Sequence, residues 1–349
     1  MIDEEKINTK INFSSTSFKK YFINTSWLFS EKIFRVVLGL VVVVAVTNYL
    51  GAKNFGLYSY ALSFTGIFSI IAGLGLDNIL TRELIKNPDK QNSLMGTSFI
   101  LKLSGAFISI ILLFSVLLIV EGDTFTRILV LIIAGSSIFQ SLYIIEFFFQ
   151  SQVLAKYPVI VKSVSFFIAS GIKLILIFLN ASLIYFAIFT TFEFLILAIG
   201  LLIIYSGKVS KIAEWKFDKR IAGELLRDSW PLILSGLAIG IYMYIGQIMV
   251  TKMLGEKENG IYATAVKLCE AFYFIPMIIT SSLFPAIVNA KKINEKLYLN
   301  RLQKLYDLLA WISIGIALII SIMSTFIIQL LYKPEYLPAA QVLTIYIWA

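Results

Sequence analysis

LGAKNFGLYSYA, at Leu50–Ala61, returns later in the chain as LGEKENGIYATA, at Leu254–Ala265. The copies lie 204 residues apart and share six of twelve positions. Each follows an apolar segment that begins with Ser-Trp, at residues 26–27 and 229–230. An internal repeat with this spacing predicts two halves of equal orientation, related by an axis along a membrane normal. The alternative is that both copies are merely similar outer turns between helices.

The composition of the chain is that of a membrane protein. Of its 349 residues 58% are hydrophobic and 15% are charged, whereas soluble domains carry roughly 25% charged residues. Ten apolar segments lie near residues 28–49, 56–81, 95–120, 128–150, 158–179, 183–205, 230–253, 260–288, 306–331 and 338–349, and the last is too short to cross a bilayer. These runs are about twice as long as a barrel strand and lack its alternation. We therefore predict an all-α polytopic membrane protein.

The connections between these segments predict the orientation. Taken alternately, they carry 19 Lys and Arg on one side and 5 on the other. Because cytoplasmic loops are enriched in basic residues, the N-terminus is expected inside. Residues 1–26 are polar and lack the apolar run of a cleavable signal peptide, so they are interpreted as a cytoplasmic tail.

Repeat and orientation together predict the domain organisation. A first lobe with six spans covers residues 27–205, and a basic cytoplasmic crossover covers residues 206–228. A second lobe with spans seven to ten covers residues 229–349. A second lobe of equal length would end near residue ~435, so we expect two six-helix lobes in a MATE-like arrangement with the second incomplete here.

The residue inventory argues against catalysis. The chain has no histidine and a single cysteine, Cys269, so neither a disulfide framework nor the usual metal ligands are available. The predicted periplasmic connections are short and hold no paired carboxylates. We expect no enzyme activity, no catalytic residue, no metal and no cofactor.

Charged residues inside the predicted spans are the main functional signal. Six are basic (Lys32, Arg35, Lys102, Lys162, Lys173 and Lys267) and four are glutamates (Glu31, Glu146, Glu193 and Glu270). Each charge costs about 2.5–3.5 kcal/mol at mid-membrane, so it must face protein, water or ligand. Lys32 and Lys162 lie near span ends, where lysines reach the interface. The deeper Arg35, Lys102, Lys173 and Lys267 are the candidates for a cationic substrate-binding cavity.

Two patterns qualify this hypothesis. Glu31 with Arg35, and Lys267 with Glu270, are spaced to pair on one helix face, so they are alternatively structural ion pairs. On the seventh span, Tyr244 and Gln247 share a small and polar face. They are candidates for contacts with sugar hydroxyls, although tyrosine in a membrane helix more often has a packing role.

Residues 26–84 carry a resemblance to a known family. The Leu-Gly-x-x-x-x-Gly-x-Tyr turn, a Gly-rich second span that reaches Leu76-Asp77, and Arg82 before a short polar turn resemble the opening of Wzx-type O-antigen flippases. These polysaccharide biosynthesis proteins belong to the MATE-like MOP superfamily. The features match as a pattern, and no individual residue role is transferred.

The resemblance implies a function and partners. It implies translocation of undecaprenyl-diphosphate-linked O-antigen units between the leaflets of the bacterial inner membrane, from the cytoplasmic to the periplasmic one. It further implies membrane lipids as surroundings, an O-antigen polymerase and a chain-length regulator as partners, and no nucleic acid. A MATE-like drug or cation antiporter is the alternative, and it would favour a cavity richer in carboxylates. A membrane enzyme is the third class.

The predicted topology is directly testable. Reporter fusions at Lys216 and Lys257 should lie on opposite sides of the membrane, cytoplasmic at Lys216 and periplasmic at Lys257, because an odd number of spans separates them. A dual alkaline phosphatase and fluorescent protein reporter measures both sites. The same side at both sites would contradict the repeat and the charge count together.

Overall fold

The structure, a computed structural model, describes residues 15–349, with side chains described from residue 35 on, except at residues 37, 281, 285, 292 and 293. No strand occurs within this described range. The main helices are α1 (Ser15–Gly73), α2 (Asp77–Lys86), α3 (Gln91–Val120), α4 (Thr124–Ala134), α5 (Ser136–Gln140), α6 (Ile144–Ser151), α7 (Lys156–Phe178), α8 (Leu183–Lys208), α9 (Lys219–Leu254), α10 (Glu256–Glu270), α11 (Phe274–Ile293), α12 (Glu295–Leu331) and α13 (Ala339–Tyr346). Short 3-10 turns join several of them. The all-α prediction is confirmed.

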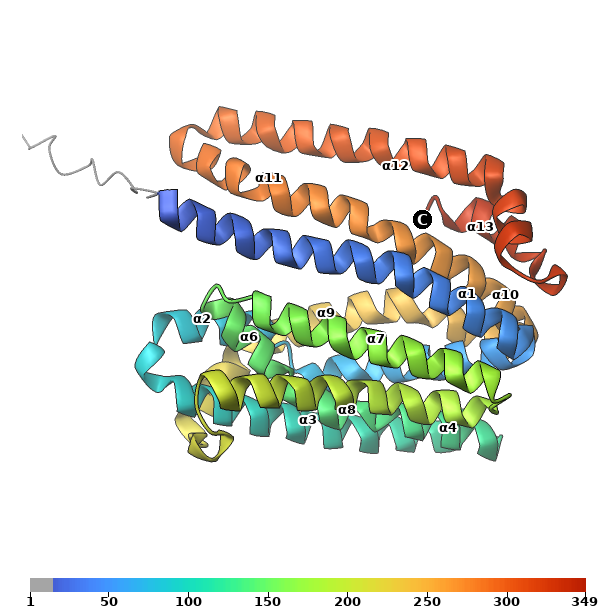
Figure 1. Ribbon diagram of the computed structural model, residues 1–349, viewed down its shortest axis with the longest axis horizontal. Helices are drawn as coiled ribbons and strands as arrows, with labels where there is room; N and C mark the ends of the chain where they lie inside the picture. The colour runs from blue at the N-terminus through green and yellow to red at the C-terminus, as the bar shows by residue number, and fades with distance from the viewer. Residues whose placement is uncertain (1–14) are drawn as a thin grey trace, which may run out of the picture.

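Eight helical stretches are long and apolar enough to span a membrane. The first, Leu38–Lys86, has 49 residues, or about 73 Å at 1.5 Å per residue, far more than the ~30 Å hydrocarbon core. It reverses at Gly51, whose φ of 73° and ψ of 165° are non-helical, and Figure 1 shows the ribbon turning back there. α1 therefore has a first arm (residues 15–50) and a second arm (residues 52–73), which correspond to two of the predicted spans.

The two repeat copies adopt the same backbone turn. Gly255 has φ 98° and ψ 174°, close to the values at Gly51, and this region is accessible essentially to glycine alone. The turns also pack on each other. A Cβ at Gly56 would lie 1.8 Å from the carbonyl oxygen of Glu256, and a Cβ at Gly260 would lie 1.9 Å from that of Ala52. Because 52 and 256 are equivalent positions of the repeat, the contact is two-fold symmetric.

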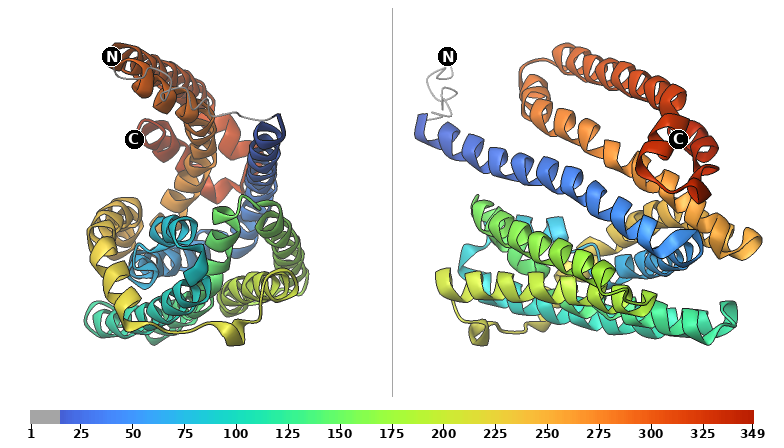
Figure 2. Two further views of the ribbon diagram at one scale, coloured as in Figure 1. Left: turned by 90° about the vertical axis from the view of Figure 1, so that its left-hand side faces the viewer. Right: turned by 45° about the vertical axis from the view of Figure 1, so that its right-hand side comes forward.

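The helices form two groups on either side of the first arm. α3, α4, α7 and α8 lie on one side, and α11, α12 and α13 lie on the other (Figures 1 and 2). The first group is held by two clusters of buried side chains, one around Tyr60 and Phe186 and one around Leu80 and Phe149. A third cluster around Tyr336 joins α10, α12 and α13 to Ala52 of α1. The arrangement agrees with the predicted MATE-like fold.

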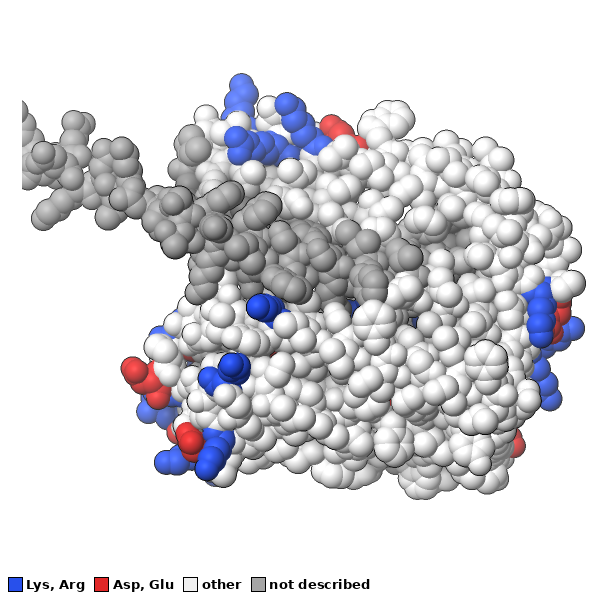
Figure 3. Space-filling view, in the orientation of Figure 1, with Lys and Arg blue, Asp and Glu red and all other residues white. Residues whose placement is uncertain are grey.

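The outer surface is apolar between two charged ends. Ile119, Phe178 and Ile322 are each more than 80% exposed, as side chains in contact with lipid are. Figure 3 shows Lys, Arg, Asp and Glu gathered toward the two ends of the molecule, with a largely uncharged band between them. This distribution is that of a multi-pass membrane protein.

Three helices begin earlier than the sequence predicts. α1 begins at Ser15, inside the predicted tail, of which residues 1–14 lie outside the described range. α9 begins at Lys219, inside the predicted crossover, because the Asp218 carboxylate accepts hydrogen bonds from the backbone N–H groups of Arg220 and Ile221. α12 begins at Glu295, where Asn294 caps it in the same way. A side-chain cap satisfies N–H groups that the helix itself leaves open, so α9 and α12 extend past the apolar runs.

The crossover lies against the first helix group. The Lys216 N–H donates to the carbonyl of Asn92 at 3.1 Å, and the Asp218 N–H donates to the Thr97 hydroxyl at 2.9 Å. A Cβ at Gly96 would lie 2.6 Å from the backbone of Lys216. The connection is thus fixed to α3 by backbone contacts before α9 begins.

The glycine contact between the repeat turns predicts a large difference between two Gly→Ala substitutions. Gly260→Ala should destabilise the protein by about 1–3 kcal/mol, because the new methyl group meets fixed backbone. Gly171→Ala is the matched control: this α7 glycine has nothing within 4 Å of a Cβ, and alanine favours the helix by about 1 kcal/mol. Thermal unfolding of both variants in detergent measures the difference, and equal melting temperatures would contradict the symmetric contact.

Candidate functional site

A break in the second span positions the central acidic residue of the site. The second arm of α1 ends at Gly73, and α2 begins at Asp77. Between them, Leu74 has φ 52° and Gly75 has φ 60°, two consecutive left-handed residues that stop the helix. A Cβ at Gly75 would lie 2.9 Å from the Leu232 side chain of α9. The break therefore lies where the two halves of the repeat meet.

Lys102 on α3 pairs with Asp77. Its ammonium donates to the Asp77 carboxylate, and its side chain is 7% exposed whereas that of Asp77 is 51% exposed. The ammonium also lies 5.2 Å from the centre of the Phe147 ring. Gly105, one turn along the helix, lets α3 approach α1 closely, since a Cβ there would lie 2.9 Å from the carbonyl oxygen of Ala72. This close approach of α3 to α1 places a buried lysine at the helix break.

A central cavity of about 310 Å³ opens beside this pair. Leu232 and Gly236 of α9 form one wall, and residues of α1, α2, α3, α5, α6 and the 3-10 turn at Ser141–Tyr143 form the others. Its polar lining side chains are Ser69, Asp77, Lys102, Ser137, Gln140, Ser141, Tyr143 and Glu146. The cavity thus combines one buried cation, two carboxylates and several hydroxyl or amide groups between the two halves of the protein.

A second ion pair borders the same cavity. Lys162 of α7 donates to the Glu146 carboxylate, which also accepts from the Gln150 amide at 3.2 Å. The Tyr143 hydroxyl is buried and makes no hydrogen bond within the described part of the protein. Arg35, one of the predicted cations, is not among the residues that line the cavity.

Lys173, another predicted cation, lies within the first helix group. Its ammonium donates to the Glu193 carboxylate of α8 at 2.6 Å, and the side chains are 22% and 31% exposed. Nearby, the Tyr58 and Thr190 hydroxyls share a hydrogen bond of 2.6 Å. Lys173 is not among the residues that line the central cavity. Its place is that of an ion pair between α7 and α8.

Lys267 and Glu270 form the predicted pair on α10, with an ammonium to carboxylate distance of 2.7 Å. The other predicted pair, Glu31 with Arg35, cannot be described in the same way, because the Glu31 side chain lies outside the described residues. The Lys267 ammonium and the Glu270 carboxylate thus form an ion pair on one face of α10, as predicted.

The predicted polar face of the seventh span packs on the second arm of α1. A Cβ at Gly66 would lie 2.8 Å from the Tyr244 ring. Gln247 is 4% exposed, and its side-chain oxygen has no partner within the described part of the chain. Both residues, predicted as candidates for sugar contacts, are placed at the contact between α9 and α1.

The ion pairs alter the predicted charge balance. The sequence suggested an interior with more basic than acidic residues, but Lys102, Lys162, Lys173 and Lys267 each have a carboxylate partner. The partner that sequence reasoning missed is Asp77. It lies at the end of the second apolar run, directly after Gly73-Leu74-Gly75-Leu76, and this glycine pair next to an acidic residue was the available signal. Among the described residues, no three metal-ligating side chains come together.

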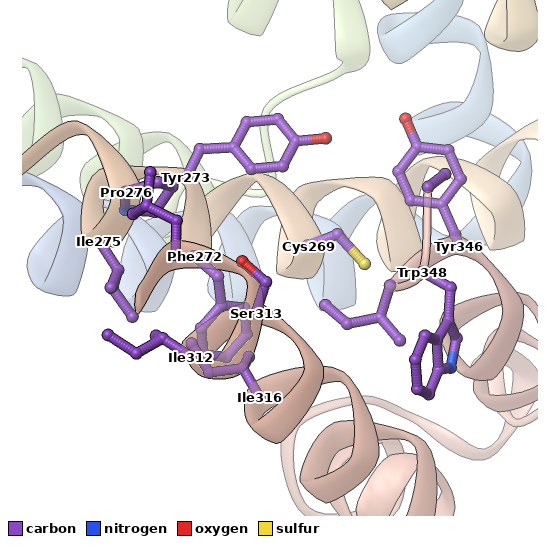
Figure 4. Close-up of a pocket in the computed structure, with 13 residues that line it drawn as sticks. Cys269, Phe272, Tyr273, Ile275, Pro276, Ile312, Ser313, Ile316, Tyr346 and Trp348 are labelled. Carbon is purple, nitrogen blue, oxygen red and sulfur yellow. The ribbon is translucent and has the colours of Figure 1, made fainter. Parts of the chain in front are cut away.

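A second cavity, of about 270 Å³, has a different character. Figure 4 shows Phe272, Tyr273 and Pro276 on one side of it and Ser313 of α12 on another. None of its lining residues is charged. This cavity therefore differs from the central one, whose lining includes Lys102, Asp77 and Glu146.

Two polar contacts join the repeat halves at the end of the molecule that carries the two glycine turns. The Lys252 ammonium of α9 lies 2.5 Å from the Glu121 carboxylate at the end of α3. The Asn259 amide donates to the carbonyl of Gly56 at 2.7 Å. By the predicted orientation this is the periplasmic end, so these contacts lie between the central cavity and the periplasm.

Comparison with known proteins identifies the class and then the family. The fold is similar to a multidrug resistance MATE family transporter of the MOP superfamily, solved in an inward-facing conformation, with a TM-score of 0.63 and 12% identity over 88% of this chain and 76% of that one. A eukaryotic MATE transporter gives a TM-score of 0.61 and 16% identity over 95% and 78%. The protein is thus a multi-pass membrane protein with a MATE-like fold.

The family follows from the sequence itself. The polysaccharide biosynthesis protein family matches residues 22–291, more than half of the chain, so the chain belongs to this family. No protein of curated function matches the sequence.

The Lys173–Glu193 pair predicts a stability pattern. Lys173→Met leaves a carboxylate without its partner, so it should destabilise the protein, by less than the roughly 3–5 kcal/mol of a fully buried pair because both side chains are partly exposed. Adding Glu193→Leu should recover most of this loss. Thermal unfolding of the single and double variants measures both effects. A double variant as unstable as the single one would contradict a structural pair.

Proposed function

We propose that this protein translocates oligosaccharide units linked to undecaprenyl diphosphate from the cytoplasmic to the periplasmic leaflet of a bacterial inner membrane. The observation that carries the proposal is the buried Lys102 beside a central cavity in a member of the polysaccharide biosynthesis protein family. A diphosphate needs cationic compensation away from water, and lysine supplies it without chemistry. The N-terminus is cytoplasmic in this proposal, with lobes at residues 27–205 and 229–349.

The cavity suits the polar part of such a substrate. Serine, tyrosine and glutamine side chains at its wall offer hydrogen bonds to sugar hydroxyls, which would otherwise be stripped of water at a high cost. The polyprenyl chain remains in lipid, so only the headgroup crosses through protein. Arg35, Lys173 and Lys267 are kept as further candidates along the path of the diphosphate, with Glu270, Tyr244 and Gln247 in supporting roles.

Release on the far side requires a rearrangement at the glycine turns. The Lys252–Glu121 pair and the backbone contact between Gly56 and Gly260 lie between the cavity and that end. Rocking of the two halves about the central cavity would separate these contacts and open the cavity to the periplasm. O-antigen polymerase and the chain-length regulator would then act on the exported unit.

A second function is supported by a specific observation. The central cavity contains two carboxylates, Asp77 and Glu146, against one lysine, and such a lining also suits a cationic drug. The second proposal is therefore a MATE-like drug or cation antiporter. Each carboxylate, however, is paired with a lysine, which leaves no excess negative charge on these two pairs.

The flippase proposal is tested by complementation. In a strain that lacks its own O-antigen flippase, the wild-type chain should restore surface O-antigen. Lys102→Ala should reduce it by about tenfold or more, as expected when one charge-assisted contact to a phosphate is lost. The measurement is the lipopolysaccharide ladder at equal membrane abundance.

The exposed Lys296 on α12 provides the matched control, since Lys296→Ala removes the same charge far from the cavity and should leave export unchanged. Resistance to lipophilic cations is measured in the same strains. Restored drug resistance without restored O-antigen would contradict the flippase and favour the antiporter.

A further inference from the structure

The pair formed by Asp77 and Lys102 is unequal in its surroundings. The lysine side chain is almost fully buried, whereas half of the aspartate side chain is exposed at the central cavity. Within the described part of the chain, the Phe147 ring also lies near the ammonium, and an aromatic ring attracts a cation but does not neutralise it. Lys102 thus depends on one carboxylate that a ligand in the cavity can reach.

Asp77 is the first residue of α2, directly after the helix break, and Leu76 at the N-cap provides no side-chain hydrogen bond. The open N–H groups at the start of α2 favour a negative charge beside them. The Tyr143 hydroxyl in the same cavity is buried without a hydrogen-bond partner in the described part of the chain. The Lys102 ammonium, the N–H groups at the start of α2 and the Tyr143 hydroxyl are all hydrogen-bond donors. A phosphate can accept hydrogen bonds from such donors as well as a carboxylate can.

We propose that the Asp77 carboxylate is a stand-in for the substrate diphosphate, which displaces it from Lys102 when the headgroup enters the central cavity. This inference rests on the proposed function. A buried lysine without a counterion is unfavourable, so Lys102 must be neutralised throughout the cycle. Exchange of one anion for another keeps Lys102 neutralised: the diphosphate binds the lysine on entry, and Asp77 forms the ion pair again on release.

The exchange has two opposite consequences for a variant without the carboxylate. Asp77→Asn removes the competitor for Lys102, so an anionic headgroup should bind more tightly. The same variant lacks the anion that takes Lys102 back, so release and export should slow. A purely structural ion pair would instead lower stability and weaken binding and export together.

The test uses the full chain in detergent, with farnesyl diphosphate as probe and farnesol as the uncharged control. Asp77→Asn should bind farnesyl diphosphate about tenfold more tightly than wild type, whereas Lys102→Gln should bind it no better than farnesol. Asp89→Asn is the matched control, because it removes one carboxylate from the exposed turn after α2 and should leave binding unchanged. Asp77→Glu keeps the charge and should bind no more tightly than wild type.

Binding is read as the melting-temperature shift caused by the probe, and Asp77→Ser replaces Asp77→Asn if the latter folds poorly. If Asp77→Asn or Asp77→Ser binds farnesyl diphosphate no more tightly than wild type does, the proposal that Asp77 competes with the diphosphate is wrong, even if wild type binds the diphosphate. Absence of diphosphate binding in every variant, with binding of tetraphenylphosphonium instead, would overturn the proposed function itself. Tighter binding together with faster export would also overturn the inference, because it would show that Asp77 is not needed for release.

Discussion

The requirement that a charge inside a bilayer has a partner organises the interior of this protein. Four lysines within the helices each meet a carboxylate, and these pairs join α3 to α2, α7 to α6 and α7 to α8, with the fourth closing on α10 itself. Three of the four pairs therefore connect different helices, in surroundings where hydrophobic attraction between helices is weak. The same pairs set the polarity of the central cavity, because the carboxylates of two of them form part of its wall. Helix packing and the chemistry of the site thus depend on one set of contacts.

The second organising element is the close approach of the repeat turns. Side chains are absent at Gly56 and Gly260, so helices α1 and α10 touch through their backbones. α9 continues this contact along the second arm of α1, where a Cβ at Gly240 would lie 1.9 Å from the Ile70 side chain. The central cavity lies beside the break before Asp77, and Leu232 and Gly236 of α9 form one of its walls. The break in the second span and the small residues of α9 together determine its location.

Much of this architecture is readable from the sequence, and the limits have physical causes. The apolar runs, the glycine turns and the Lys267–Glu270 pair depend on spacing within one segment, which sequence periodicity reports directly. The Lys102–Asp77 pair joins residues on two helices and depends on two left-handed residues at the break, a geometry that hydropathy does not encode. Likewise, α9 and α12 begin before their apolar runs because caps, not hydrophobicity, fix their starts. For Tyr244 and Gln247 the side-chain chemistry was readable, but their position against the second arm of α1 was not.

The symmetric contact between the turns has a consequence for how the two copies have diverged. Contacts in which a residue of one copy meets the equivalent neighbour of the other are those of a two-fold homodimer. In a homodimer every substitution would appear twice at the axis. Joined in one chain, the two copies can differ independently. The first copy has Ala52 where the second has Glu256, so the Lys53–Glu256 pair at 3.6 Å has no counterpart at Lys257. Asn259 likewise occupies the position that Phe55 has in the first copy. A single chain thereby gives each half a partner that fits only one way, which a symmetric dimer of identical halves could not do.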